Sequence, residues 1–217
     1  MADNKFELRA YCYLDRMQPQ YAAFVGTITQ GDLPIEGMAS LYVEVAPGND
    51  VFRLVDIAVK STDAKPGAQI VEREFGMFEV HSLKQAEVLE AGRIVLERLD
   101  LKPEDRLKPT VASVQLITHV NTYQVQLLNR FRRGAMLVAG ETLFIMEVAP
   151  AAYINLAANE AEKYASVKLI HVSSVGRFGR MCSSVGRFGR MWMSGTEAEM
   201  MAAQRAAIAA IENLQGK

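Results

Sequence analysis

The chain has 217 residues, half of them hydrophobic, so it can form one large domain or two domains of about 100 residues. Its 24 basic and 25 acidic residues give a net charge of −1, which argues against a protein that mainly coats nucleic acid or an anionic membrane. The charged N-terminus lacks an apolar stretch, and no run of about 18 apolar residues follows, so we expect no secretory signal and no membrane span. Two isolated cysteines, Cys12 and Cys182, fit reduced thiols in a cytosolic protein better than a disulfide framework.

In the first half of the chain, the hydrophobic pattern predicts four strands and two helices. Val51, Leu54, Val55 and Ala58 recur at i, i+3, i+4 and i+7, which indicates a helix after the turn chemistry at 47–50. A second helix is expected to open at a capping box, with Ser82 as N-cap, and to end near Leu99. The expected strands cover residues 6–14, 21–29, 38–45 and 68–80.

The second half repeats this order of elements. A helix is expected over 151–165, and a last helix opens at a second capping box, formed by Thr196 and Glu199. The pattern predicts an α+β fold in each half: an antiparallel, four-stranded sheet with helices on one face, and a bare second face that needs a partner. The expected strands cover residues 111–120, 125–131, 143–148 and 167–175.

An internal repeat explains this recurrence. Residues 41–47 (LYVEVAP) resemble residues 144–150 (FIMEVAP) at an offset of 103 residues, from Glu44 to Glu147. The same offset aligns Gly31 with Gly134, Gly37 with Gly140, Ala58 with Ala161, Lys60 with Lys163, and Gly76 with Gly179. We therefore expect a tandem duplication, with a first domain over 1–103 and a second over 108–217, joined at a charged segment with two prolines.

A second repeat is of a different kind. Residues 173–181 (SSVGRFGRM) recur letter for letter as residues 183–191. Perfect identity suggests a recent duplication, an engineered insert or an artefact of recording rather than old divergence. We expect the extra segment to lie outside the fold, either looped out or displacing its twin.

Signals of catalysis are poor. The chain has no GxGxxG, GxxxxGK[ST], HExxH or GxSxG motif, and His81, His119 and His171 lack metal-ligand spacing. We expect no catalytic residue, metal or cofactor. Two segments, 129–134 and 176–180, mix arginine with phenylalanine, which a nucleic-acid binder could use, but solvated arginines at strand ends are the favoured interpretation.

Two charged clusters remain. Asp56 and Lys60 stand at i, i+4 on the first predicted helix, an ordinary intrahelical pair, and Lys163 falls on the same position of the second half. Glu72 and Arg73 lie near a strand end before a glycine, which by itself indicates only a solvated strand end.

Together these residues resemble the bacterial microcompartment (BMC) shell domain, and the Asp56-x-x-x-Lys60 helix is similar to the DAxxKA-type helix of that family. Two fused copies resemble the tandem class, and within it the carboxysome shell proteins. The resemblance covers nearly the whole chain. The matching segments are 7–15, 72–76, 106–109, 129–134, 139–143, 150–153 and 157–163.

The resemblance implies two circularly permuted BMC domains and a structural shell protein of the cytoplasmic carboxysome. It implies a pseudohexagonal homotrimer, face-to-face stacking of two trimers as a homohexamer, and contacts with other BMC shell proteins. Lys60 and Lys163 would lie at tile edges, and Glu72 and Arg73 would gate a central pore for ribulose bisphosphate and phosphoglycerate. Neither nucleic acid nor membrane is expected as a partner.

The duplicated segment departs from this family pattern. At the 103-residue offset it starts beside the expected pore loop of the second domain, which comprises Val175, Gly176, Arg177 and Arg180. The alternative function is a small-molecule enzyme or sensor on a duplicated α+β scaffold, which would show turnover or saturable ligand binding.

Overall fold

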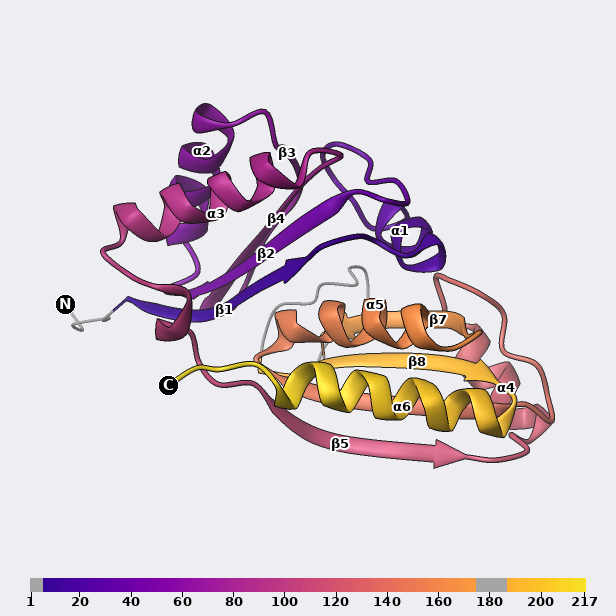
Figure 1. Ribbon diagram of the computed structural model, residues 1–217. Coiled ribbons are helices and arrows are strands. Elements are labelled where there is room, and N and C mark those ends of the chain that lie inside the picture. Colours follow the sequence, from indigo (N-terminus) through magenta and orange to yellow (C-terminus); the bar gives the residue numbers. More distant parts are fainter. Residues whose placement is uncertain (1–5, 175–186) are drawn as a thin grey trace.

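The computed structural model describes residues 6–174 and 187–217 of the chain. The first half contains four strands and three α-helices among its described residues, and a short 3₁₀ turn, η1 (Pro103–Asp105), follows them (Figure 1). In chain order the elements are β1 (Glu7–Leu14), α1 (Pro19–Gly26), β2 (Ala39–Ala46), α2 (Asp50–Ser61), β3 (Lys65–Glu72), β4 (Phe75–Ser82) and α3 (Gln85–Arg98).

The second half repeats this order. Gly37 and Gly140 occupy the same position of the two halves with φ of 87° and 86°, a conformation that glycine adopts at little cost. The elements are β5 (Thr110–Ile117), α4 (Thr122–Asn129), β6 (Thr142–Ala149), η2 (Ala151–Tyr153), α5 (Ile154–Tyr164), β7 (Lys168–Ser174), β8 (Gly189–Gly195) and α6 (Glu197–Glu212).

Each half forms one antiparallel, four-stranded sheet. The strand orders are β1-β2-β4-β3 and β5-β6-β8-β7, so the two sheets have the same topology. Helices α2 and α3 cover one face of the first sheet, and α5 and α6 cover the same face of the second (Figure 1). The predicted α+β fold of two tandem permuted domains is confirmed.

Two predicted strands, 21–29 and 125–131, are wrong because the segments form the helices α1 and α4. Their aromatic and β-branched residues favoured strands. Pro19 at the first position of α1 starts a helix well, because its fixed φ suits that position and its missing N–H would have no helical partner. In α4 the Asn121 side chain caps the helix by accepting the Tyr123 N–H at 2.9 Å.

The predicted strand 68–80 is a hairpin, β3 and β4, and the strand after β7 was not predicted at all. The number of strands per half was therefore right only because a false strand offset a missed one. The capping box at Ser82 is also wrong: Lys84 is the N-cap of α3, and the Ser82 hydroxyl accepts the Lys84 N–H at 3.1 Å. The second capping box, of Thr196 and Glu199, is confirmed.

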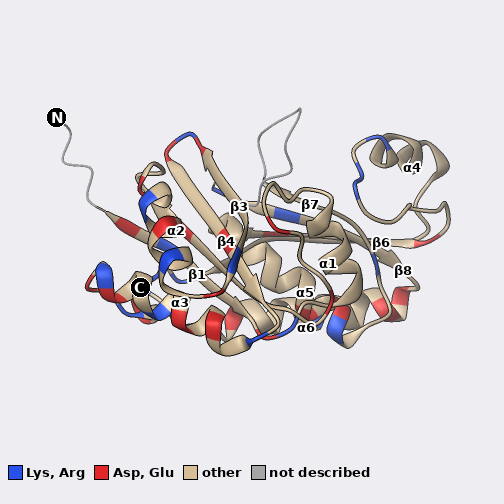
Figure 2. Cartoon of the chain, turned by 90° about the horizontal axis from the view of Figure 1, so that it is seen from above, with Lys and Arg blue, Asp and Glu red and all other residues tan. Residues whose placement is uncertain are grey.

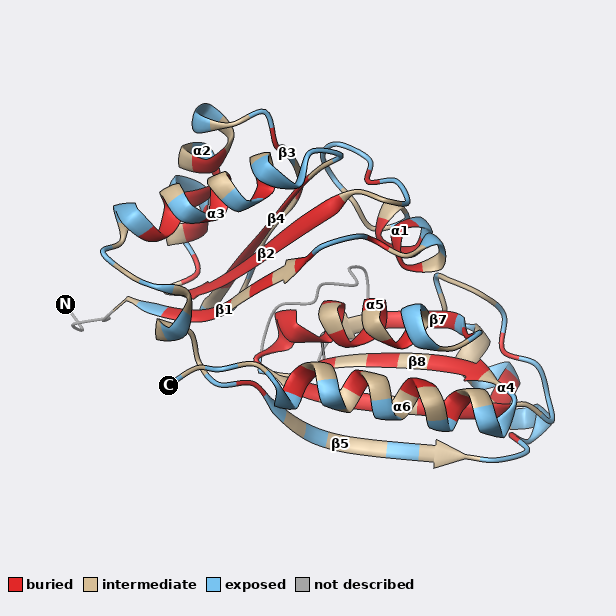
Figure 3. Ribbon diagram, in the orientation of Figure 1, coloured by how far each residue is buried: buried red, intermediate tan, exposed pale blue. Residues whose placement is uncertain are grey.

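The first sheet is buried on both faces. Leu41, Val43 and Phe78 pack under α2 and α3, whereas Cys12 and Tyr42 on the opposite face belong to a core shared with the second half. The second sheet has no such cover along its edge strand: β5 is half-buried or exposed along its whole length, whereas most residues of its counterpart β1 are buried (Figure 3). The sheet face expected to be bare is therefore covered in the first half, whereas in the second half it is covered where Leu143 packs with Val125 of α4 and is open along β5.

Basic and acidic residues are interspersed over the elements of both halves, in keeping with the near-zero net charge (Figure 2). Within the described residues, no helix combines the length and the apolar character that a membrane crossing requires.

Candidate functional site

The tip of the β3–β4 hairpin carries the two predicted gate residues. Glu72, the last residue of β3, pairs with Phe75, the first of β4, so Arg73 and Glu74 alone make the turn. Arg73 has a φ of 58°, in the left-handed region that residues other than glycine seldom adopt. The side chains of Arg73 and Glu74 are exposed and Glu72 is half-buried, so the tip presents both signs of charge to solvent.

A chain of contacts ties this tip to the second half. The Arg9 guanidinium lies over the Phe75 ring, 3.5 Å from its centroid, and its Nε donates to Glu44 Oε1 at 2.8 Å. The other carboxylate oxygen of Glu44 accepts the Ala152 N–H at 2.9 Å. Burial raises the pKa of Glu44 to about 7, although Arg9 and the Ala152 N–H oppose the shift.

A cavity of about 510 Å³ lies beside the tip, at the junction of the two halves. Lys217, which lines this cavity, forms an ion pair with Asp105, with Nζ 2.5 Å from Oδ1. Because Arg9 and Lys217 are paired with Glu44 and Asp105, the positive charge that this cavity offers to an anion comes from Lys108 and Arg187. Its charged lining residues are Arg9, Glu74, Lys108, Arg187 and Lys217.

The equivalent hairpin of the second half has a longer connection. Val71 pairs with Gly76 in the first hairpin, and Ser174 pairs with Gly189 in the second. The predicted pore-loop residues of this connection, Val175, Gly176, Arg177 and Arg180, lie outside the described residues.

The register also corrects one pair of the sequence alignment. Gly76 pairs with Val45, and Gly189 pairs with the equivalent Val148, so the structural counterpart of Gly76 is Gly189 and not Gly179. The strand β8 therefore takes its first residues from the second copy of the exact repeat, and the ten extra residues fall in the connection before it.

The two predicted edge lysines occupy equivalent positions in the last turns of α2 and α5. Lys60 Nζ lies 2.7 Å from Asp56 Oδ2, and the Lys60 side chain is 73% exposed. Lys163 Nζ lies 3.5 Å from Glu160 Oε1 and 3.6 Å from Asp15 Oδ2 of the first half. Both ammonium groups are thus accessible from solvent.

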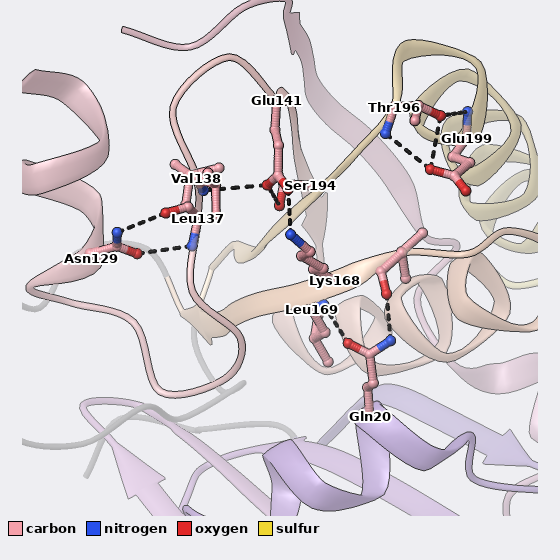
Figure 4. A network of polar contacts seen from close by, with 11 residues as sticks. Gln20, Asn129, Leu137, Val138, Glu141, Lys168, Leu169, Ser194, Thr196 and Glu199 are labelled. Carbon is pink, nitrogen blue, oxygen red and sulfur yellow. Dashed lines mark hydrogen bonds and ion pairs between the residues drawn. The ribbon is translucent and has the colours of Figure 1, made fainter. Parts of the chain in front are cut away.

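Helix α1 lies across the second half. The first N–H groups of α1 are capped by side chains of α5: Glu162 accepts from Gln20 N at 2.7 Å and from Tyr21 N at 2.8 Å. The Gln20 side chain accepts the Leu169 N–H of β7 at 3.1 Å and donates to the Val167 carbonyl (Figure 4). Helix α1 has no side-chain cap of its own, and these contacts cap its N-terminus and hold the helix between α5 and β7.

One turn further along, Phe24 completes this packing. Its ring meets His171 of β7 edge-on, with centroids 6.0 Å apart, and Phe24 is only 2% exposed. Burial and the charge of Arg133 lower the pKa of His171 to about 4, so the imidazole is neutral at neutral pH.

Helix α4 is the counterpart of α1, but it meets nothing comparable in the described part of the chain. The positions equivalent to Gln20, Phe24 and Ile28 are Tyr123, Leu127 and Phe131, which are 77%, 60% and 54% exposed. Burial differs so strongly between equivalent positions because the second half covers this face of α1, whereas α4 packs on the described residues with its other face, through Val125.

The place equivalent to the seat of α1 also exists in the first half. A groove of about 450 Å³ lies between α2 and β3, and we call it the α2–β3 groove. In the second half, the residues equivalent to the lining of this groove contact α1. They include Asn159, Glu162, Leu169 and His171. The α2–β3 groove is lined by Gln30, Gly31, Phe52, Val55, Asp56, Val59 and residues 66–69.

Sequence reasoning missed both helices and this groove. The available signal was the spacing of Tyr123, Leu127 and Phe131 at i, i+4 and i+8, which fits one helix face. In the described residues, no group of three or more His, Cys, Asp or Glu side chains is placed to hold a metal ion.

The fold and the duplicated halves define a class, the tandem microcompartment shell proteins. The structure is similar to the fused permuted hexameric shell protein of the RMM microcompartment, with a TM-score of 0.89 and 39% identity over 97% of this chain and 99% of the other. It is equally similar to the double ringed trimeric shell protein of the same microcompartment, with a TM-score of 0.89 and 30% identity over 98% and 99% of the two chains.

Sequence comparison narrows the class. The CsoS1D N-terminal domain family matches residues 8–105. The carboxysome shell protein CcmP of Synechococcus elongatus is 48% identical over 97% of this chain and 94% of its own length. The carboxysome shell protein CsoS1D of Hydrogenovibrio crunogenus is 42% identical over 96% and 97%. The chain therefore belongs to the CcmP and CsoS1D family of tandem BMC-domain carboxysome shell proteins: it is a structural component of the shell and not an enzyme.

Proposed function

We propose that three copies of this chain close into a ring of six BMC domains, one domain over 1–103 and one over 108–217 in each copy, around a gated pore. The observation that carries this proposal is the contrast between α1 and α4. Helix α1 is seated on the second half of its own chain, and α4 has the same shape with its apolar face exposed. A neighbouring copy offers the matching seat in its α2–β3 groove.

The side chains of the two surfaces support this assembly. Phe52 in the groove is 53% exposed, and Tyr123 and Leu127 on α4 are 77% and 60% exposed. Asp56 occupies the position equivalent to Asn159, whose side chain accepts the Gln18 N–H of α1 at 2.9 Å. The Asp56 carboxylate can therefore accept the N–H of Asn121, the equivalent of Gln18, in a neighbouring copy. Val59 replaces the capping Glu162, and α4 correspondingly carries its own cap from Asn121.

A contact between two different surfaces of the same protein forms a closed ring when the rotation from one copy to the next is a whole fraction of 360°. Six equivalent domain contacts, three within chains and three between them, then complete the tile. The names of the similar structures, a fused hexameric and a trimeric shell protein, fit a ring of this composition.

The hairpin tips supply the gate of this proposed pore. In a trimer, Glu72 and Arg73 occur three times around one axis, so carboxylates and guanidiniums of neighbouring copies can pair and close the opening. Exposed ion pairs stabilise by about 0–1 kcal/mol each. Open and closed arrangements would therefore differ by only a few times that amount, and a ligand could shift the balance. The second hairpin would contribute Val175, Gly176, Arg177 and Arg180.

Phosphorylated metabolites are the proposed cargo, with ribulose bisphosphate passing inward and phosphoglycerate outward. The cavity beside the hairpin tip supports this choice, because Lys108 and Arg187 line it and outnumber Glu74, while Arg9 and Lys217 are paired with Glu44 and Asp105. Lys60 and Lys163 are proposed to contact other BMC shell proteins at the tile edges.

Stacking of two trimers face to face is part of the proposal. Leu33 and Ile35 are 63% and 54% exposed, and the equivalent Met136 and Val138 are 56% and 47% exposed. An apolar patch that recurs in both domains would appear six times on one ring, and a second ring could cover it. One similar structure is a double ringed trimer.

The mass in solution tests the assembly. A trimer of the 24.0 kDa chain weighs about 72 kDa and a stacked pair about 144 kDa. We expect one of these masses, with hexagonal particles and a central hole in electron images. A monomer or dimer without a hole would contradict the proposed ring, and a 72 kDa particle alone would contradict the stacking.

A further inference from the structure

A buried polar network lies behind the wall of the α2–β3 groove. Its centre is His81 on β4, whose side chain is 0% exposed. The ring Nδ1 lies 3.1 and 3.2 Å from the two carboxylate oxygens of Glu79, and Nε2 lies 3.2 Å from Asp32 Oδ1. Glu79 is also fully buried and accepts the Ser40 hydroxyl at 2.5 Å. The gate and the ring contacts described above use none of these groups.

The geometry around His81 favours the doubly protonated ring. A neutral imidazole carries one N–H, so one of its two nitrogens would face a carboxylate oxygen with a lone pair. An imidazolium donates from both nitrogens, and its positive charge is then shared between the two carboxylates of Glu79 and Asp32. Both ring nitrogens can therefore donate to these carboxylates only when His81 is charged.

The network reaches the groove through one loop. The N–H groups of Gln30 and Gly31 both donate to the Gly67 carbonyl, at 3.0 and 2.9 Å, and the Asp32 N–H donates to the Pro66 carbonyl at 2.9 Å. Gln30, Gly31, Pro66 and Gly67 all line the α2–β3 groove. His81 holds the side chain of Asp32 from behind, so it adds a charged tether to the three backbone bonds.

Gly67 shows how closely the network fits against the strand. A Cβ at this position would lie 2.3 Å from Glu79 Oε2 and 3.1 Å from the His81 ring, so only glycine leaves room for the pair. A displacement of the Glu79 or His81 side chain would therefore displace the backbone of Gly67, which forms part of the groove wall.

The second half provides an internal contrast. Its equivalent loop makes the same backbone bonds: Arg133 and Gly134 donate to the Ile170 carbonyl, and Ala135 donates to that of Leu169. The network behind it is missing, because the positions equivalent to Asp32, Ser40, Glu79 and His81 hold Ala135, Leu143, Trp192 and Ser194. The imidazolium-dependent tether of the first half is thus not repeated at the equivalent positions of the second half.

We propose that protonated His81 fixes the loop 30–32 in the wall of the α2–β3 groove, so that seating of a neighbouring copy's α4 is strongest when His81 is charged and weakens when it loses its proton. This inference rests on the proposed ring and adds a pH-dependent control to its interface.

The direction of the pH dependence follows from the groups around His81. Burial disfavours the charged ring, but the hydrogen bonds and charges of Glu79 and Asp32 outweigh it, so the pKa of His81 lies above its ordinary value. The stabilisation is then complete below about pH 6.5 and is lost as the pH rises through the raised pKa. The other titratable groups that face the network are Lys65, opposite His81 on β3, and Tyr42 with its hydrogen-bond partner Tyr21, near Glu79.

Amide hydrogen exchange tests the tether directly. Between pH 6.5 and 8.5, we expect exchange of the amides of residues 30–32 to accelerate about tenfold relative to those of residues 133–135, which have the same backbone bonds and act as the control at each pH. In Asp32→Asn, and in His81→Gln, this relative rate should no longer change with pH. Asp32 is half-exposed, so its variant tests the tether even if the buried substitution unfolds the chain.

Sedimentation of the same samples separates the two proposals. If the ring forms, the dissociation constant of the trimer should rise about fivefold or more over this pH range in the wild type and stay constant in Asp32→Asn. A stable ring with a constant exchange ratio would overturn the role of His81 and leave the ring intact. A monomer at both pH values, with the exchange ratio still rising, would overturn the ring and its pH-dependent seating but retain the tether.

Discussion

Replacing Leu127 by Asp should prevent the proposed ring from forming. Leu127 is 60% exposed, whereas the equivalent Phe24 is 2% exposed where α1 is seated. Full burial of a leucine side chain stabilises by about 1.5–3 kcal/mol, so covering the exposed part contributes about 1–2 kcal/mol at each interface. A carboxylate against the apolar side of the groove adds a desolvation cost of comparable or larger size. With three such interfaces in a ring, the trimer should weaken at least about a hundredfold.

The assay is sedimentation equilibrium over a range of concentrations, with circular dichroism as a check on folding. Leu83→Asp is the matched control: Leu83 is 66% exposed, and the equivalent position in the second half, Thr196, is exposed too. The control should assemble like the wild type. Trimers of unchanged stability in Leu127→Asp would refute the seating of α4 in the α2–β3 groove.

Three further predictions concern other parts of the chain. Arg9→Gln leaves the buried carboxylate of Glu44 without its cation and should lower the free energy of unfolding by about 3–5 kcal/mol at pH 8, with partial recovery at pH 5, where Glu44 is protonated; equal losses at both pH values in urea denaturation would contradict this. Glu72→Ala should keep the ring and remove its closed state, so electron images that still show closed pores would count against the gate. Deletion of residues 175–184 shortens the β7–β8 connection from 14 to 4 residues and should leave the fold unchanged, with stability higher by about 1 kcal/mol; loss of the folded state would show that the repeat is needed.

The structure confirms the predicted duplication because two patterns in the sequence were strong and local. The offset from Glu44 to Glu147 fixed the correspondence of β2 with β6, and the heptad-like spacing from Val51 to Ala58 fixed α2. The predictions for α1 and α4 failed because eight-residue segments rich in aromatic and β-branched residues do not separate helix from strand by periodicity. In α1 the deciding contact is the capping by Glu162, which lies 142 residues away from Gln20.

The sequence by itself determined the two α+β domains and the equivalence of Lys60 with Lys163, since these depend on local order and on an internal copy to compare with. The class of the protein and the candidate charges at Glu72 and Arg73 came from the resemblance of the sequence to a known family. Only the tertiary structure decided that Gly189 and not Gly179 continues the second sheet, because strand register depends on which residues pair across space. It also decided that α1 is covered and α4 is not. That difference arises because the second half packs against α1 in the same chain, whereas the seat that we propose for α4 lies in another copy.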